Sequence, residues 1–197
     1  MGYADEHNSE YYEHYHEKYK FWGGSRYDSP EFVEGLNKFV DTVIRLCHPK
    51  QILDIGCALN IPVSYAVKKY GLVDSLGIDI APYAYEHSHD QERHMVQDIS
   101  QPFDLERKFD LVTCIETVEH LNYADSMVAL DNITKHARKY VLFSSTPFDF
   151  MEPTHLTVLP QCVWVAEFLK RDFIMFSNYA PHDFVPWSML FINKDII

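Results

Sequence analysis

The stretch QILDIGCALNIPVSY, residues 51–65, has the pattern of a buried strand, a tight turn and a helix, which is typical of nucleotide-binding α/β proteins. Its apolar start ends in Asp54, and Gly56 follows in the turn. Ala58 and Asn60 occupy positions where such turns usually carry further glycines. Asn tolerates the left-handed backbone region better than most residues, and Ala adds only a methyl group. We therefore expect a modified turn that still binds a cofactor.

Strands and helices are expected to alternate along the rest of the chain. Ser29 as an N-cap and Pro30 at the first helical position predict an amphipathic helix over residues 30–47. The other expected helices are 61–71, 122–139 and 160–171, and the expected strands are 50–56, 74–80, 94–98, 108–116, 140–146, 172–180 and 187–195. This alternation predicts an α/β fold with a mostly parallel, seven-stranded, doubly wound sheet.

Length and charge limit the possible function classes. The 197 residues fit one domain, and 17 basic against 29 acidic residues give a net charge of −12. Nucleic-acid binders usually carry a basic footprint, so the expected partner is a small molecule rather than a nucleic acid. No apolar run approaches the ~20 residues of a membrane span, and the acidic N-terminal stretch is unlike a signal peptide. We therefore expect a cytoplasmic protein without a membrane span, and the oligomeric state is left open.

Polar residues stand at the carboxyl ends of the predicted strands. In parallel α/β sheets, ligands bind beyond these strand ends. The candidates are Asp54, Asp79, Asp98, Glu116 and Thr146. Asp79 follows Asp54 at close to the ~20-residue offset of a ribose-binding acid. The alternative interpretation is that Asp54 and Asp79 only cap neighbouring turns.

Four motifs in order, LDIGCALN, LGIDIAP, QDIS and FDLVTCIETVEHL, resemble those of the class I S-adenosylmethionine-dependent methyltransferases. The resemblance implies a Rossmann-like methyltransferase domain over residues 29–197, whose last two strands form an antiparallel hairpin. It also implies S-adenosylmethionine as cofactor, with Asp79 on the ribose, Asp98 on the adenine amino group, and Ile80 on the adenine ring unless it is a core residue. The expected cofactor-binding residues are Asp54, Gly56, Cys57, Ala58, Asp79, Ile80, Asp98, Ile99, Ile115 and Glu116.

Catalytic candidates lie in and after the fourth motif. An oxygen acceptor must lose its proton to a base or a metal ion during methyl transfer. In the stretch IETVEHL, His120 is the expected base because the reference pKa of histidine is ~6.5, and Glu119 stands beside it. His155 is expected at the same rim, in the loop after the fifth strand.

The same residues form a candidate metal site. Glu116, Glu119 and His120 share one face if their segment turns helically, and His155 completes a set of two imidazoles and two carboxylates. Such a set binds Zn²⁺, Mn²⁺ or Mg²⁺, and the resemblance implies the same four positions. The alternative is a metal-free acceptor clamp made of His120 and His155.

Residues 1–28 form an aromatic segment that is expected to be helical. The aromatic residues that recur at helical spacing are Tyr11, Tyr12, Tyr15, Tyr19 and Trp22. Two interpretations stand: an amphipathic helix packed on the domain, or a lid over the acceptor pocket hinged at Gly23–Gly24. An aromatic lid would suit a planar or apolar acceptor and exclude water.

Three function classes follow. The leading class is O-methylation of a small molecule, because the E-x-x-E-H stretch and the later histidine resemble ubiquinone-biosynthesis O-methyltransferases. The second is RNA 2′-O-methylation, since small-RNA 3′-terminal enzymes carry the same stretch, although the charge of −12 argues against it. The third is a non-catalytic protein that binds S-adenosylmethionine or S-adenosylhomocysteine through the altered turn.

Overall fold

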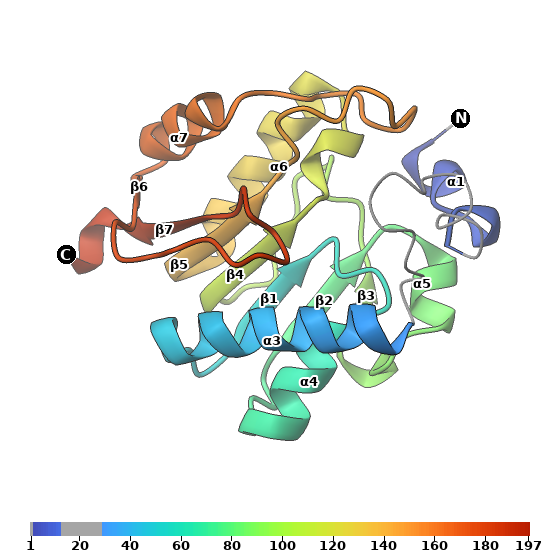
Figure 1. Ribbon diagram of the computed structural model, residues 1–197, viewed down its shortest axis with the longest axis horizontal. Coiled ribbons are helices and arrows are strands. Elements are labelled where there is room, and N and C mark those ends of the chain that lie inside the picture. The colour runs from blue at the N-terminus through green and yellow to red at the C-terminus, as the bar shows by residue number, and fades with distance from the viewer. Residues whose placement is uncertain (1, 13–28) are drawn as a thin grey trace.

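The computed structural model describes residues 2–12 and 29–197. Its centre is a seven-stranded sheet in the order β3-β2-β1-β4-β5-β7-β6 (Figure 1). The strands are β1 (Ile52–Ile55), β2 (Leu76–Asp79), β3 (His94–Val96), β4 (Phe109–Ile115), β5 (Ala137–Ser144), β6 (Phe173–Met175) and β7 (Met189–Asn193). The first five strands pair in parallel, whereas β7 is antiparallel to both β5 and β6. The expected mostly parallel sheet with a C-terminal antiparallel hairpin is therefore confirmed.

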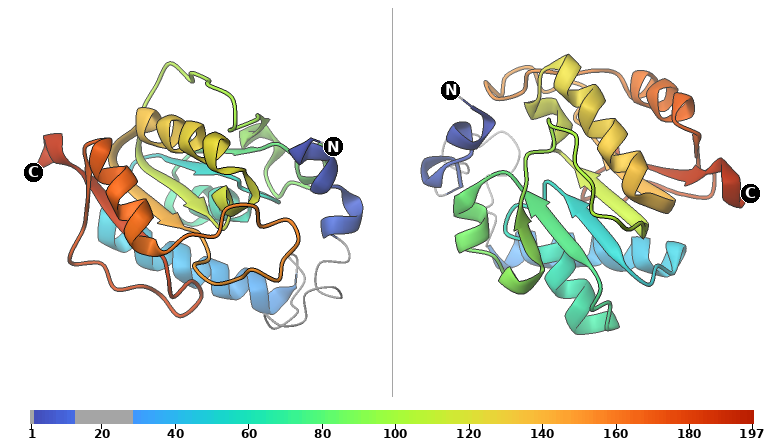
Figure 2. Two further views of the ribbon diagram at one scale, coloured as in Figure 1. Left: turned by 90° about the horizontal axis from the view of Figure 1, so that it is seen from above. Right: turned by 180° about the vertical axis from the view of Figure 1, so that it is seen from behind.

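Helices pack on the two faces of this sheet (Figure 2). The α-helices are α1 (Tyr3–Glu6), α3 (Pro30–Cys47), α4 (Ile61–Tyr70), α5 (Pro82–Glu86), α6 (Tyr123–His136) and α7 (Gln161–Lys170), and the short 3₁₀ turns are η2 (Gln91–Arg93), η3 (Val118–His120) and η4 (Lys194–Ile196). Side chains alternate along a strand, so Leu53 joins the core under α6 and α7, while Ile52 joins the core under α3. None of the helices in the described ranges has the length and apolarity that a membrane crossing requires.

The helix before β1 forms as its sequence predicts. The Ser29 hydroxyl accepts a hydrogen bond of 3.3 Å from the Phe32 backbone N–H and so caps α3. The second half of α3 buries Phe39 and Val43 against the sheet. Phe32 and Leu36 in the first half line the cavity described below, so the same helix stabilises the sheet and reaches the site.

The boundary between α6 and β5 differs from the sequence-based expectation. The helix predicted to run to Lys139 ends at His136, and β5 begins directly at Ala137. Ala137 is already paired with Phe109 at the start of β4. Pairing in the central sheet therefore outweighs the helical periodicity of these residues, a tertiary effect that local sequence does not show.

The described N-terminal residues pack beside the carboxyl ends of the strands. The Tyr3 hydroxyl donates a hydrogen bond of 2.6 Å to Asp125 Oδ2 and accepts one of 2.9 Å from Asn122 Nδ2. The Tyr12 ring is buried and stacks on Tyr83, with ring centroids 5.4 Å apart. The other residues of the expected aromatic helix and hinge lie outside the described residues: Tyr15, Tyr19, Trp22, Gly23 and Gly24.

Candidate active site

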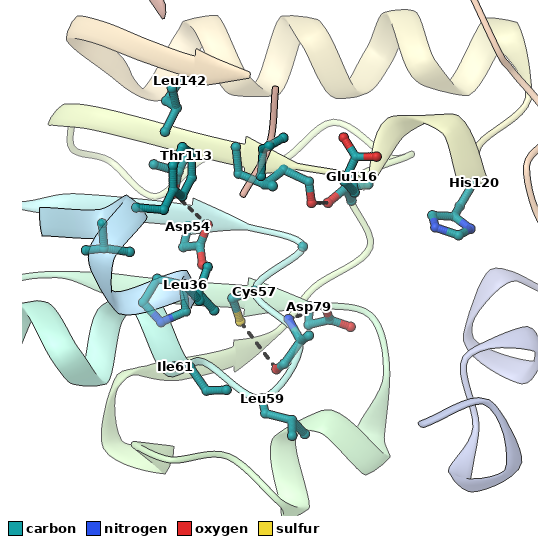
Figure 3. Close-up of a pocket in the computed structure, with 18 of the residues that line it drawn as sticks. Leu36, Asp54, Cys57, Leu59, Ile61, Asp79, Thr113, Glu116, His120 and Leu142 are labelled. Atoms are coloured by element: carbon teal, nitrogen blue, oxygen red, sulfur yellow. Dashed lines mark hydrogen bonds between the residues drawn. The ribbon is translucent and has the colours of Figure 1, made fainter. Parts of the chain in front are cut away.

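A cavity of about 580 Å³ opens at the carboxyl ends of β1, β2 and β4 (Figure 3). This is where ligands of parallel α/β sheets bind, and the volume lies in the range of small-molecule sites, roughly 300–1,000 Å³. Tyr3, His7 and Tyr11 contribute to its wall from the N-terminal residues. Every residue that the sequence predicts to bind the cofactor lines this cavity: Asp54, Gly56, Cys57, Ala58, Asp79, Ile80, Asp98, Ile99, Ile115 and Glu116.

The turn after β1 keeps the backbone of a glycine-rich turn, although Ala58 and Asn60 stand where further glycines are usual. Gly56 has φ 74°, and a Cβ at this position would overlap the Thr117 hydroxyl. Ala58 and Asn60 adopt φ of 46° and 58°, in the left-handed region that glycine usually fills. The Asn60 amide donates hydrogen bonds of 3.0 Å to the carbonyls of Asp90 and Arg93 and so holds the turn in place. The predicted modified turn is thus present.

Asp79 and Asp98 mark the edge of the cavity at the ends of β2 and β3. Asp79 Oδ2 accepts a hydrogen bond of 2.9 Å from the Ala58 N–H, and Oδ1 accepts one of 2.9 Å from the Ala81 N–H. Asp98 Oδ1 accepts from the N–H and hydroxyl of Ser100 at 2.8 and 2.6 Å. Asp79 therefore does cap its turns, and because each carboxylate oxygen has two lone pairs, it also keeps acceptor capacity toward the cavity.

Asp54 lies at the floor of the cavity, 4% exposed. Its Oδ1 accepts a hydrogen bond of 2.5 Å from the Thr113 hydroxyl on the neighbouring strand β4. Burial raises the pKa of Asp54 to about 6, the Thr113 hydrogen bond lowers it in part, and the negative charge of Asp79 raises it further. A carboxyl with this pKa changes its charge close to physiological pH.

Two histidines stand at the end of the cavity nearest the N-terminal residues. His120 and His155 have ring centroids 4.8 Å apart, and the His7 ring lies 4.9 Å from that of His120. Burial, with the nearby His7 and His155, lowers the pKa of His120 well below its ordinary value, so the imidazole is neutral at neutral pH. His155 Nδ1 lies 3.0 Å from the Asp149 carbonyl. Because a carbonyl only accepts, His155 carries its proton on Nδ1.

Glu116 and Glu119 differ in their position relative to the cavity and in their hydrogen-bond partners. Glu116 lines the cavity, and its Oε1 accepts a hydrogen bond of 2.7 Å from Trp187 Nε1. Glu119 is completely buried outside the cavity lining, and its Oε1 accepts from the Thr146 N–H at 3.4 Å. Burial raises the pKa of both carboxyl groups, and the Glu116 charge raises that of Glu119 further. Glu119 is thus held behind Glu116, and its predicted catalytic role stays a prediction.

Glu119 also ties the loop after β5 to η3 through its backbone. Its carbonyl accepts hydrogen bonds from the N–H groups of Leu156 and Thr157 at 2.7 and 3.0 Å. These bonds hold the loop so that His155 lies beside His120, as the sequence predicts.

The four residues predicted as metal ligands lie near one another without forming a coordination set. Glu116 accepts a hydrogen bond from Trp187, and Glu119 is completely buried outside the cavity lining. Within residues 2–12 and 29–197, no group of three or more His, Cys, Asp and Glu side chains is arranged to hold a metal ion. These donors, as arranged here, do not fit a metal ion.

The charged side chains that line the cavity in the described residues are acidic. Its acidic lining residues are Glu31, Asp54, Asp79, Asp98, Glu116, Asp149 and Asp183. Among the described residues, no lysine or arginine lines it. An anionic ligand would therefore meet several carboxylates and no basic side chain from this part of the chain.

Sequence reasoning missed three residues of this site. Trp187 comes from the connection between β6 and β7, where no motif points to the cavity. Thr154 and Glu152 stand behind His120, whose Nδ1 lies 3.0 Å from the Thr154 hydroxyl. Their position in the stretch EPTH, directly before His155, is a signal that could have pointed to them.

Comparison with known proteins identifies the family of the chain. A family model described as a methyltransferase domain matches residues 27–197. An amino pentose methyltransferase from Micromonospora echinaspora, solved with S-adenosylmethionine bound, has a TM-score of 0.68 at 13% identity, over 91% of this chain and 96% of that one. A magnesium protoporphyrin IX methyltransferase from Synechocystis, solved with S-adenosylhomocysteine, has a TM-score of 0.67 at 15% identity, over 96% and 97%. A sugar N-methyltransferase from Streptoalloteichus has a TM-score of 0.66 at 14% identity, over 89% and 92%.

Proposed function

The chain belongs to the methyltransferase domain family, and we propose that it transfers the methyl group of S-adenosylmethionine to a hydroxyl oxygen of a small molecule. The likeness to the solved structures concerns the fold, and the proposal about the reaction rests on the cavity. The cofactor supplies a methyl group that its sulfonium already activates. The chain must therefore bind it, orient the acceptor and hold the acceptor proton.

The residues present fit the cofactor. Gly56 and Ala58 line the cavity with left-handed backbone, and a Cβ at Gly56 would overlap Thr117, which also lines it, so this turn forms the proposed cofactor cradle. Asp79 has acceptor capacity for the ribose hydroxyls, and Asp54 at the floor is the carboxylate available to the ammonium group of the methionine part. These features also favour binding over the alternative of a turn that has lost its ligand.

The observation that carries O-methylation is the position of the His120 imidazole in the cavity wall, beside that of His155. Burial lowers its pKa, so at neutral pH the ring is unprotonated and offers a lone pair to an acceptor hydroxyl. A hydroxyl acceptor must release a proton as its oxygen attacks the methyl group. His155, beside it, provides a second imidazole that can bind the acceptor.

The charge of the cavity supports an uncharged or cationic acceptor. With seven acidic side chains and no described lysine or arginine in the lining, phosphate groups are repelled, which weighs against RNA. The same charge attracts amines, so N-methylation of an amine is the second candidate function.

The N-terminal residues are the proposed lid. Tyr3, His7 and Tyr11 line the cavity, and the rings of His7 and Tyr11 lie against His120. These contacts favour the lid over an N-terminal segment that only packs on the domain.

The test is S-adenosylhomocysteine release with phenols, alcohols, amines, carboxylates and RNA 3′ ends as acceptors. We expect turnover of a hydroxyl compound and a fall of ~10²-fold or more in His120→Gln. The matched control is His89→Gln, an exposed histidine outside the cavity lining. Turnover of amines alone, insensitive to His120→Gln, would favour the second candidate. Calorimetry without heat for either S-adenosylmethionine or S-adenosylhomocysteine would overturn both.

A further inference from the structure

We propose that Thr154 and Glu152 are positioning residues that hold the His120 imidazole in one tautomer, with Nε2 directed to the acceptor. The inference rests on the proposed function of His120 as the proton acceptor. It assigns a role to two residues that do not line the cavity and lie behind the histidine. The relay is defined as the hydrogen-bonded chain His120–Thr154–Glu152.

The direction of the hydrogen bonds in the relay follows from what each group can do. The Thr154 hydroxyl lies 2.8 Å from Glu152 Oε1 and 3.0 Å from His120 Nδ1. A carboxylate only accepts, so the single hydroxyl proton of Thr154 goes to Glu152. The hydroxyl oxygen must then accept from His120 Nδ1–H. The neutral imidazole therefore carries its proton on Nδ1 and has its lone pair on Nε2.

Nε2 of His120 is the nitrogen available to a ligand. The contact with the Thr154 hydroxyl uses the other ring nitrogen, Nδ1, and His120 lines the cavity. Figure 3 shows its ring at the cavity end, apart from Glu116 and beside the N-terminal residues. An acceptor hydroxyl entering the cavity can donate to this nitrogen.

The loop that carries the relay is built to keep it in place. Asp149 Oδ1 accepts hydrogen bonds from the N–H groups of Met151 and Glu152 at 3.2 and 3.3 Å. The Glu152 carbonyl accepts from the His155 N–H at 3.0 Å, and the Glu152 side chain is buried, with 3% of its surface exposed. A buried carboxyl held at the backbone on both sides can orient a hydroxyl without rotating away.

The relay matters most at the moment of transfer. The acceptor O–C bond forms as the C–S bond to the methyl group breaks, and the hydroxyl proton passes to His120 Nε2. The ring then carries a positive charge, and its Nδ1–H still donates to Thr154. The carboxylate of Glu152, one hydroxyl away, stabilises that charge. The other products are the methylated acceptor and neutral S-adenosylhomocysteine.

The experiment compares Thr154→Val, which keeps the shape and loses the hydroxyl, with Thr154→Ser, which keeps the hydroxyl. We expect Thr154→Val to lower kcat by ~10- to 100-fold while calorimetry shows S-adenosylmethionine affinity within ~2-fold of wild type. Thr154→Ser should recover most of that loss, and Glu152→Gln should give an intermediate kcat. Equal kcat in Thr154→Val and wild type, or no recovery in Thr154→Ser, would overturn the relay.

Nitrogen NMR of the histidine side chains tests the relay without any acceptor, and so separates its failure from a failure of the proposed function. We expect His120 of the wild-type chain to be protonated on Nδ1, and Thr154→Val to shift it toward the other tautomer. His155 is the internal control, because the Asp149 carbonyl holds its Nδ1 proton independently of Thr154. Protonation of His120 on Nε2 in the wild type would contradict the inference even if methyl transfer occurs.

Discussion

Trp187 Nε1 donates a hydrogen bond of 2.7 Å to Glu116 Oε1, across a sequence separation of 71 residues. Glu116 stands at the end of β4 with φ 49°, and Trp187 reaches it from the connection before β7. This contact joins the central parallel strands to the C-terminal hairpin at the cavity. Burial raises the pKa of the Glu116 carboxyl, and the hydrogen bond from Trp187 lowers it. Loss of that bond would leave a buried acceptor without this partner, which is costly.

A double-mutant cycle measures this contact. We expect Trp187→Phe and Glu116→Ala each to lower the free energy of unfolding, and the double variant to lose ~1–2 kcal/mol less than the sum. Urea denaturation of the four proteins gives the coupling. The matched control is Trp164→Phe with Glu116→Ala, because Trp164 Nε1 is buried and has no hydrogen-bond partner among residues 2–12 and 29–197. Additive losses in the Trp187 cycle, as in the control, would contradict the finding.

The left-handed backbone of Ala58 makes a second prediction. Ala58→Gly removes the left-handed strain of ~1 kcal/mol but gives the unfolded chain a similar gain in entropy. We expect a free energy of unfolding within ~1 kcal/mol of wild type and retained S-adenosylmethionine binding. Ala58→Val places a β-branched side chain at φ 46° and should weaken binding by ~10-fold or more in calorimetry.

A substitution at Gly56 complements Ala58→Gly and Ala58→Val. Gly56→Ala should be the most damaging change in the turn, because its Cβ would overlap the Thr117 hydroxyl. Normal binding by both Ala58→Val and Gly56→Ala would mean that the turn does not form the cofactor cradle.

The acidic residues at the strand ends and the turn after β1 could be predicted from the sequence. The positions of Asp54, Asp79 and Asp98 follow from strand periodicity and the rule that ligands bind at strand ends. The conformation of Asn60 follows from its tolerance of positive φ. These inferences need no knowledge of how distant segments meet.

The rest of the site depends on long-range packing. Trp187 and Thr154 contact Glu116 and His120 only because two irregular loops return to the strand ends. Helical spacing placed Glu119 on the same face as His120, but the segment forms a 3₁₀ turn, and only His120 of the two lines the cavity. A pattern of three and four residues predicts proximity, and it does not predict which side chain faces the ligand.

The proposed lid makes a third prediction. Tyr3→Phe removes the hydroxyl that bonds Asp125 and Asn122, so the N-terminal residues should detach more often. We expect faster hydrogen exchange in residues 2–12 and an increase of ~3- to 10-fold in KM for the acceptor. Tyr85→Phe, at an exposed tyrosine outside the cavity lining, is the control. Faster exchange with an unchanged KM would contradict the lid.

Removal of metal ions gives a fourth prediction. Glu116, Glu119, His120 and His155 do not form a coordination set, so dialysis against a strong chelator should leave S-adenosylhomocysteine release within ~2-fold of the untreated protein. Restoring Mg²⁺, Mn²⁺ or Zn²⁺ separately should not increase it. A large fall that one ion reverses would show that these side chains rearrange around a metal during turnover.

The pKa of Asp54 predicts how S-adenosylmethionine binding depends on pH. Burial raises this pKa to about 6, so the carboxyl of the free protein is largely protonated below pH 6 and ionised above it. The methionine ammonium favours the ionised form, so binding lowers the pKa and affinity increases as pH rises through about 6. Calorimetry from pH 5 to pH 8 should show that the affinity falls by up to ~10-fold for each pH unit below about 6 and is constant above that value.

The control is Asp54→Asn, which cannot ionise. It should bind S-adenosylmethionine more weakly at pH 8 and show little change in affinity across the range. A wild-type affinity that is flat from pH 5 to pH 8, or one that increases as pH falls, would place the ammonium away from Asp54.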